Sequence, residues 1–269
     1  MIIIGEKING AIPSIRQAIA EKNEALIIER TLAQAKAGAN FLDCAPSTAT
    51  EIEYDTMVWL IDLMQGCTDV PLCIDSPDAS LLARILEEGH VRKPGMVNSV
   101  NEEGTKCERL FPLIAGTPWE VVGLTCDRDG IPADPKKKVE IAKRIIDKAD
   151  KYGVALNQLH IDPCVMALAT MPSAMEDFAY CIQAIHEHAP TVKVTGAISN
   201  ISFEMPARKY VNMNCMAYAI AAGLDSAIMD PCSADMMGTV YACEALRMKD
   251  KGGRKYNRAY RKGLFGQKK

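Results

Sequence analysis

The sequence contains no apolar segment long enough to cross a membrane as a helix. Such a helix needs about 20 consecutive apolar residues, and no stretch of the chain approaches that length. The apolar run at residues 1–4 is too short for the core of a signal peptide, and the carboxylate of Glu6 follows almost at once. We therefore expect a cytoplasmic protein with no membrane partner.

Cysteine and histidine are present, but not in the spacings that bind metal. The ten cysteines include no CxxC pair and form no cluster with the four histidines. Structural zinc sites need such spacing, and disulfide frameworks are typical of small secreted chains, so we expect neither of them and no metal. Most of the cysteines suit small buried hydrophobic positions. Cys44 and Cys126, near predicted strand ends, are the candidates for a reactive thiol.

The chain also lacks an excess of positive charge. It has 31 Lys and Arg against 34 Asp and Glu, a net charge of -3, whereas nucleic-acid-binding domains are usually basic. We expect no nucleic-acid partner. One segment differs, because the tail from about residue 249 to 269 holds nine Lys or Arg together with three aromatic residues. This tail is either a solvated helix that packs its aromatics under the body of the protein, or a docking surface for an acidic partner.

What the chain does have is an eightfold alternation of short apolar runs and amphipathic segments. Runs of this length are typical of strands buried on both faces. They cover residues 2–5, 40–43, 71–75, 95–98, 120–125, 158–162, 193–198 and 225–229. Parallel strands need helical crossovers, and eight strand–helix units predict a (β/α)8 TIM barrel that occupies residues 1–269 as one domain. An open doubly wound sheet is the alternative, although no GxGxxG turn is present.

A carboxylate, carboxamide or hydroxyl follows almost every predicted strand. In chain order these residues are Glu6 and Asn9, Asp43, Asp75 and Ser76, Asn98 and Asn101, Thr125 and Asp127, Asp162, Ser199 and Asn200, and Asp230. Loops favour Asp and Asn because both form local turn hydrogen bonds. Turn chemistry alone is nevertheless a weak explanation for so many polar residues at one mouth, where barrels of this kind place their active sites.

These side chains suit a flat, neutral heterocycle that is rich in N–H donors. A carboxylate accepts paired hydrogen bonds from an amino group and an adjacent ring N–H, while a carboxamide both donates and accepts. A phosphate would need a glycine-rich nest or arginines, which these strand ends lack. The pterin ring of a folate is a ligand of the expected kind.

The sequence resembles the pterin-binding methyltransferases, particularly the methyltetrahydrofolate:corrinoid methyltransferases, over nearly its whole length. The matching segments are Ile3-Ile4-Gly5-Glu6-Lys7-Ile8-Asn9-Gly10, Leu42-Asp43, Leu72-Cys73-Ile74-Asp75-Ser76, Met96-Val97-Asn98-Ser99, Gly123-Leu124-Thr125, Ile161-Asp162-Pro163, Ser199-Asn200-Ile201-Ser202 and Ala222-Gly223-Leu224-Asp225. The resemblance implies a homodimeric barrel. It also implies pterin contacts at Asp75, Asn98, Asp162 and Asn200.

The resemblance further implies the reaction. A methyl group would move between N5 of tetrahydrofolate and the cobalt of a corrinoid that a partner protein carries, with no metal bound by this chain itself. Asn200 would be the catalytic residue that hydrogen-bonds N5. The folate would also contact Ser199, Glu6, Asn9, Asp43 and Arg208.

Two departures from the acetogenic members bear on the direction of transfer. Those members look like they carry an Asn shortly after the Asp of the second strand. This chain reads Asp43-Cys44-Ala45 there. After Asn200 they have a Gln where this chain has Phe203. The Asp43-Cys44-Ala45 stretch, followed by Glu51-Ile52-Glu53-Tyr54, looks closer to members that serve demethylation pathways, such as O-demethylation. In those pathways the methyl passes from a methylated corrinoid protein to tetrahydrofolate.

Three alternatives stay open at this point. The first is transfer from methyltetrahydrofolate to a corrinoid iron–sulfur protein, and the second is a dihydropteroate synthase. A synthase is expected to need basic residues at the late strand ends for its pyrophosphate leaving group, and only Arg208 lies near them. The third is a folate-binding protein without catalysis. If the resemblance holds, the acidic partner that would dock on the tail is the corrinoid protein.

Overall fold

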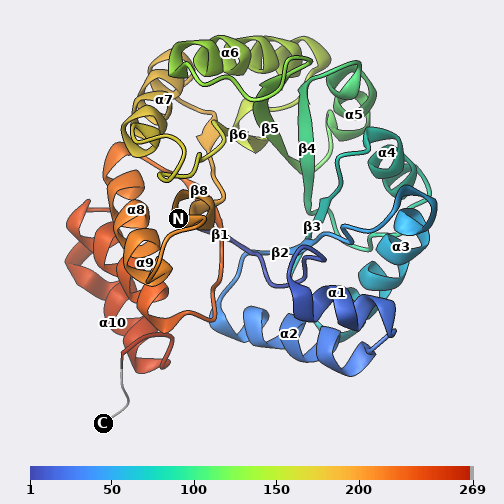
Figure 1. The fold of residues 1–269 in the computed structure, drawn as a ribbon, viewed down its shortest axis with the longest axis horizontal. Helices are drawn as coiled ribbons and strands as arrows, with labels where there is room; N and C mark the ends of the chain where they lie inside the picture. Colours follow the sequence, from blue (N-terminus) through green and yellow to red (C-terminus); the bar gives the residue numbers. More distant parts are fainter. Residues whose placement is uncertain (267–269) are drawn as a thin grey trace.

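Eight short strands run parallel to one another inside a ring of helices (Figure 1). The computed structural model describes residues 1–266. The strands are β1 (Ile2–Gly5), β2 (Phe41–Cys44), β3 (Leu72–Asp75), β4 (Met96–Glu102), β5 (Glu120–Asp127), β6 (Leu159–Asp162), β7 (Lys193–Val194) and β8 (Ser226–Met229). Their order in the sheet follows the chain from β7 back to β1, and β1 pairs with β8 on its other side. This is the order of a (β/α)8 barrel, as the alternation of the sequence predicts.

The barrel closes between β7 and β8 through single hydrogen bonds rather than a full ladder. The Asp225 N–H donates to the Val194 carbonyl at 3.1 Å, and the Ile228 N–H donates to the Gly196 carbonyl at 3.0 Å. The expected strand 193–198 is therefore too long. Gly196 lies so close to α7 that an added Cβ would stand 2.7 Å from the ring of Phe178, and the chain then leaves the sheet in a 3-10 turn, η2 (Ile198–Ser202).

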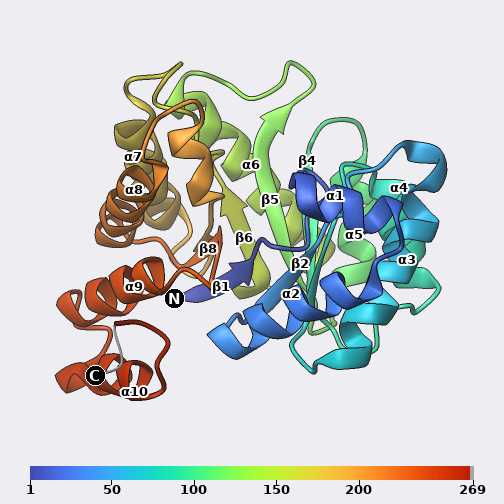
Figure 2. The ribbon, with the colours of Figure 1, turned by 60° about the horizontal axis from the view of Figure 1, so that its bottom comes forward.

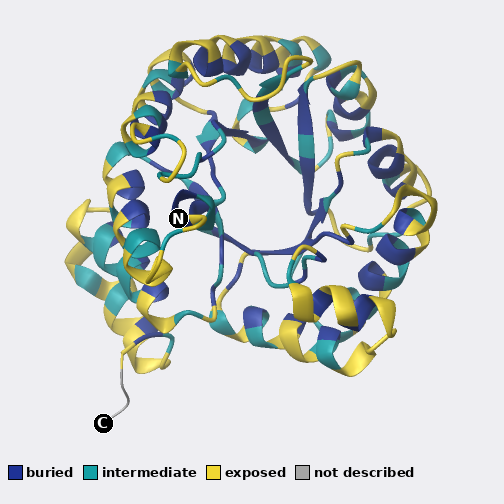
Figure 3. Ribbon diagram, in the orientation of Figure 1, coloured by how far each residue is buried: buried dark blue, intermediate teal, exposed yellow. Residues whose placement is uncertain are grey.

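The helices cover the outside of the barrel in chain order. They are α1 (Pro13–Ala20), α2 (Glu24–Ala37), α3 (Thr50–Cys67), α4 (Ala79–Glu87), α5 (Lys106–Ile114), α6 (Pro135–Tyr152), α7 (Ala174–His188), α8 (Arg208–Ala222), α9 (Ala234–Leu246) and α10 (Arg254–Arg261). Their faces toward the barrel are buried and their outer faces are exposed (Figure 3). Gly38 ends α2 in the left-handed conformation with φ of 96°, which is the usual role of glycine at the end of a helix. None of the helices described for residues 1–266 is both long and apolar enough to span a membrane.

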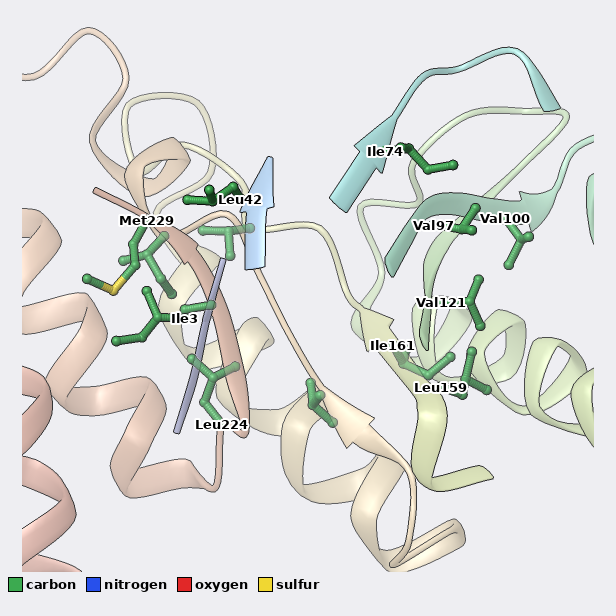
Figure 4. Packing of buried hydrophobic residues seen from close by; sticks show 14 of the residues in the cluster. Ile3, Leu42, Ile74, Val97, Val100, Val121, Leu159, Ile161, Leu224 and Met229 are labelled. Atoms are coloured by element: carbon green, nitrogen blue, oxygen red, sulfur yellow. The ribbon is translucent and has the colours of Figure 1, made fainter. Parts of the chain in front are cut away.

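Strand alternation decides which residues reach the mouth of the barrel. Successive side chains of a strand point to opposite faces. One set packs outward against the helices, including Ile3, Leu42, Ile74, Val97, Val121, Leu159 and Ile161 (Figure 4). The other set fills the barrel with a second apolar cluster of Ile4, Phe41, Cys73, Met96 and Val122. Two residues further along each strand, the inward positions are Glu6, Asp43, Asp75, Asn98 and Leu124.

The tail packs at the end of the barrel opposite the mouth. The amino group of Met1 pairs with Glu244 near the end of α9, so α9 runs from the mouth down to the start of β1. In Figure 2 the strands point upward and α10 lies below α9. Phe265, only 6% exposed, packs against Tyr241, Tyr256 and Tyr260. The aromatics therefore pack as predicted, whereas docking on the tail stays a prediction, and residues 267–269 lie outside the described residues.

Candidate functional site

A cavity of about 950 Å³ opens at the carboxyl ends of the strands. The structure brings together in its wall every residue that the sequence marks as a ligand contact. They are Glu6, Asn9, Asp43, Asp75, Asn98, Asp162, Ser199, Asn200 and Arg208. They come from five strands or their carboxyl ends (β1, β2, β3, β4 and β6) and from the segment after β7, so the convergence is a product of the closed barrel.

Three aspartates line the inner part of the cavity, and burial raises the pKa of each of them. It raises the pKa of Asp75 to about 7, with a further contribution from the nearby carboxylate of Glu53. Burial also raises the pKa of Asp162 to about 6, against the Cys164 N–H and Lys138, which lower it. The pKa of Asp43, which is 1% exposed, is raised well above its ordinary range by burial and by the charge of Asp75. A donor-rich ligand would stabilise the ionised forms of these groups.

Local turn chemistry does not account for the central polar residues. In the part of the chain that the structure describes, the side chains of Asp75, Asn98 and Asn200 form no hydrogen bond. The helix after Asp75 is capped by a different residue, since Asp78 accepts from the Ser80 N–H at 2.7 Å. These three side chains therefore retain their hydrogen-bonding capacity for a ligand.

The remaining predicted contacts combine local structure with exposure to the cavity. Asp162 accepts from the Cys164 N–H at 2.7 Å through Oδ1. Asn9 accepts from the Ala11 N–H at 2.9 Å and donates to Oδ2 of Asp43 at 3.4 Å. The other oxygen of Asp43, Oδ1, is buried and has no partner among residues 1–266. An unsatisfied buried oxygen costs free energy, so a ligand N–H at this position would be favourable.

Asn200 owes its position to a braced turn. It lies in η2, and its backbone carbonyl accepts from the Phe203 N–H at 3.2 Å. The guanidinium of Arg208 donates to the Ser199 carbonyl at 2.7 Å and to the Ser202 hydroxyl at 2.9 Å. Arg208 thus fixes the turn from the start of α8. The idea that the Asn200 side chain caps the following helix finds no support, because the cap of α8 is Ala207 without a side-chain hydrogen bond.

Several residues of the cavity wall were not predicted as contacts. Lys7 pairs with Asp230 at 2.8 Å, just beyond the ends of the neighbouring strands β1 and β8. Asn212 lies one turn after Arg208 on α8, and its buried Oδ1 has no partner within the described residues. The spacing of four residues is a helical signal that could have found Asn212. Ile131, about half exposed, comes from a loop and has no sequence signal of this kind.

The two candidate thiols do not line the cavity. Cys44 points away from the barrel interior into the outer core, 3.6 Å from the sulfur of Met57, and burial raises its pKa well above the ordinary value. Cys126 accepts from Asn101 at 3.1 Å, and burial raises its pKa as well. A raised pKa disfavours the nucleophilic thiolate. The hypothesis of a catalytic thiol at either position is therefore wrong for geometric and electrostatic reasons.

His160 lies in the barrel interior at its base, as its alternation with Ile161 predicts. Its Nδ1 is 2.7 Å from the Ser226 hydroxyl, and Nε2 contacts Glu120, which also pairs with Lys193 at 2.6 Å. This cluster is at the opposite end of the barrel from the cavity. Among residues 1–266, no three His, Cys, Asp or Glu side chains are arranged to hold a metal ion. That the protein needs no metal stays a prediction.

Comparison with known proteins places this geometry in a family. The family model for pterin-binding enzymes matches residues 13–230. A methylcorrinoid:tetrahydrofolate methyltransferase of Eubacterium limosum is 47% identical over 268 residues, which cover 99% of this chain and 98% of the relative. A methionine synthase of Mycobacterium tuberculosis is 31% identical over 85% of this chain, but the match spans only 20% of that larger protein.

Solved structures agree on the fold. A dihydropteroate synthase of Xanthomonas albilineans with 4-aminobenzoic acid superimposes with a TM-score of 0.68 at 18% identity, covering 93% of this chain and 92% of that one. A Yersinia pestis dihydropteroate synthase gives 0.65 at 17% identity over 92% and 94%. At such identity the likeness concerns the fold alone. The family match over most of the chain and the full-length relative together establish that this chain belongs to the pterin-binding enzymes.

Proposed function

We propose that this protein transfers a methyl group from a methylated corrinoid protein to N5 of tetrahydrofolate. The observation that carries the proposal is the full-length identity of 47% to a methylcorrinoid:tetrahydrofolate methyltransferase. The cavity supports it, because its size lies within the range for small-molecule sites, and the carboxylates of Asp43, Asp75 and Asp162 in its wall can accept hydrogen bonds from a pterin.

The pterin ring lies against the inner carboxylates in this proposal. Asp75 and Asp162 accept from the amino group and ring N–H groups along the pterin edge, and Asn98 adds a hydrogen bond that can run in either direction. All three side chains line the same cavity. Binding in this way orients N5 and excludes water from it, which is the main task of the protein when the cobalt of the partner supplies the reactive methyl group.

Asn200 acts at N5 itself. During transfer the charge at N5 changes, because the N5 lone pair forms the bond to the methyl carbon while the cobalt–carbon bond breaks. A carboxamide can donate to a neutral nitrogen or accept from a protonated one by turning its amide group. The unpartnered side chain of Asn200 on its braced turn is suited to this role. The same contact serves the reverse direction by microscopic reversibility.

The finer features of the proposal concern assembly and pathway. The protein is proposed to act as a homodimer with the single domain 1–269, to use no metal of its own, and to serve a demethylation pathway such as O-demethylation. The corrinoid partner approaches the open mouth, where the half-exposed side chains of Ile131 and Phe203 offer an apolar rim. Sedimentation of the purified protein tests the dimer directly.

The reaction is tested by anaerobic mixing of the protein with methylcobalamin and tetrahydrofolate. Formation of cob(I)alamin changes the absorbance spectrum and reports transfer as it happens. The proposal predicts a change that requires both the protein and the folate. A protein that binds tetrahydrofolate without any transfer would instead be a folate-binding protein, and formation of dihydropteroate from a pterin pyrophosphate and 4-aminobenzoate would indicate a dihydropteroate synthase.

A further inference from the structure

The proposed transfer releases a proton, and the protein needs a group to receive it. The N5 of tetrahydrofolate carries one hydrogen. Attack on the methyl group leaves the electron pair of the cobalt–carbon bond on cobalt and gives N5 a positive charge. The N5–H bond must then break, with its electron pair returning to N5, to yield neutral methyltetrahydrofolate. A carboxamide such as Asn200 is too weak a base to accept this proton.

Most carboxylates of the cavity are unsuited to the role. Asp43 is 1% exposed, its Oδ2 already accepts from Asn9 at 3.4 Å, and among the described residues no hydrogen bond joins it to the turn that carries Asn200. The carboxylate of Asp230 already has a partner, because it forms an ion pair with Lys7 at 2.8 Å. Asp75 and Asp162 are engaged with the pterin edge in the function proposed above. The carboxylate that remains in the cavity wall is Glu6.

Glu6 is connected to the turn that carries Asn200. It is the first inward-facing residue after β1, partly buried at the mouth. The hydroxyl of Ser199 donates to its Oε2 at 3.3 Å, and Ser199 immediately precedes Asn200 in η2. We infer that Glu6 accepts the proton that leaves N5, with the Ser199 hydroxyl as the link, an inference that rests on the proposed methyl transfer.

The surroundings of Glu6 raise its pKa above that of a solvated glutamate. Burial raises the pKa of Glu6 from its ordinary value and is the largest contribution. The charge of Lys7 lowers this pKa and the charge of Asp230 raises it. The hydrogen bond from Ser199 and the charge of Arg208 lower it further. Asp43 also faces it from β2. Because burial is the largest contribution, Glu6 is a stronger base than a solvated glutamate. In the forward direction Glu6 must be ionised, and in the reverse direction it must be protonated.

The test is the pH dependence of both directions at saturating folate with soluble cobalamin. In the wild-type protein, the rate of transfer to tetrahydrofolate is expected to rise with pH through the pKa of Glu6. The rate from methyltetrahydrofolate to cob(I)alamin is expected to fall through the same pKa. Glu6→Gln keeps the size of the side chain but removes the base, and it should lower both rates by about 10²-fold and abolish this pH dependence. Formate should restore part of the activity of Glu6→Ala.

Asp230→Asn is the matched variant on the same rim. It removes a negative charge that raises the pKa of Glu6 and releases Lys7, which lowers it. Both effects lower the pKa of Glu6. The midpoint of the pH–rate profile should therefore move to lower pH, while the rate still depends on pH in the same direction. If Glu6→Gln retains the wild-type profile, or if Asp230→Asn moves the midpoint upward, Glu6 is not the acceptor. A wild-type protein without any transfer would instead contradict the proposed function, so the two failures are distinguishable.

Discussion

Replacing Asn200 with alanine removes an amide whose partner in the proposal is N5 of the folate. In the described structure its side chain forms no hydrogen bond, and the turn is held instead by Arg208 and by backbone contacts. The substitution therefore leaves no buried group without a partner, and we expect little change in folding stability. The loss should appear in the reaction.

The expected size of this loss follows from the role of a preorganised hydrogen bond at a centre whose charge changes. Removing one such bond costs about 10²–10³ in rate, or roughly 2.7–4 kcal/mol. We expect Asn200→Ala to lower the single-turnover rate by that order in both directions, while tetrahydrofolate affinity falls less, because the contact strengthens as charge develops.

Single-turnover kinetics on three variants separates this role from a merely structural one. Asn200→Ser and Asn200→Asp keep an oxygen that could support the turn, but neither keeps an amide that both donates and accepts at the same reach. Both variants should remain strongly impaired. Near-wild-type rates in Asn200→Ser would refute the reasoning. They would mean that the side chain supports only the turn, a role that serine can also fill.

Three further predictions follow, two on Asp75 and one on metal. Asp75→Ala should weaken tetrahydrofolate binding strongly, and unchanged affinity in calorimetry would show that the pterin is placed wrongly. Because burial raises the folded-state pKa of Asp75 to about 7 from the ordinary 3.8, the ligand-free protein should lose stability as pH rises from about 4 through 7. Asp75→Asn should therefore raise the Tm more at pH 8 than at pH 4, and an equal effect at both would contradict this assignment. Exhaustive chelation should leave methyl transfer intact, and stoichiometric zinc in elemental analysis would count against a metal-free site.

Much of the site follows from the period of the strands. Once Ile4 and Cys73 are recognised as inward-facing, Glu6 and Asp75 must point into the mouth two residues later. The sequence therefore predicts the polar ring, and the ends of β3 and β6 at Asp75 and Asp162 are predicted correctly. Alternation is a local property of the chain, which is why it can be read without the fold.

Other features depend on contacts between distant segments. The early end of β7 reflects the packing of Gly196 against Phe178 on α7, a contact that no local pattern indicates. Lys7 becomes part of the cavity through its ion pair with Asp230, at the far end of the chain. Ile131 reaches the rim because the loop after β5 folds over the mouth.

The most direct test of the central claim follows the methyl carbon itself. Methylcobalamin labelled with ¹³C in the methyl group is incubated anaerobically with tetrahydrofolate and the protein, and the products are examined by ¹³C NMR. The account predicts that the label leaves cobalt and appears on N5 of methyltetrahydrofolate, at a rate that depends on the protein and falls by about 10²–10³ with Asn200→Ala. Label that stays on cobalt while tetrahydrofolate is bound would contradict the account.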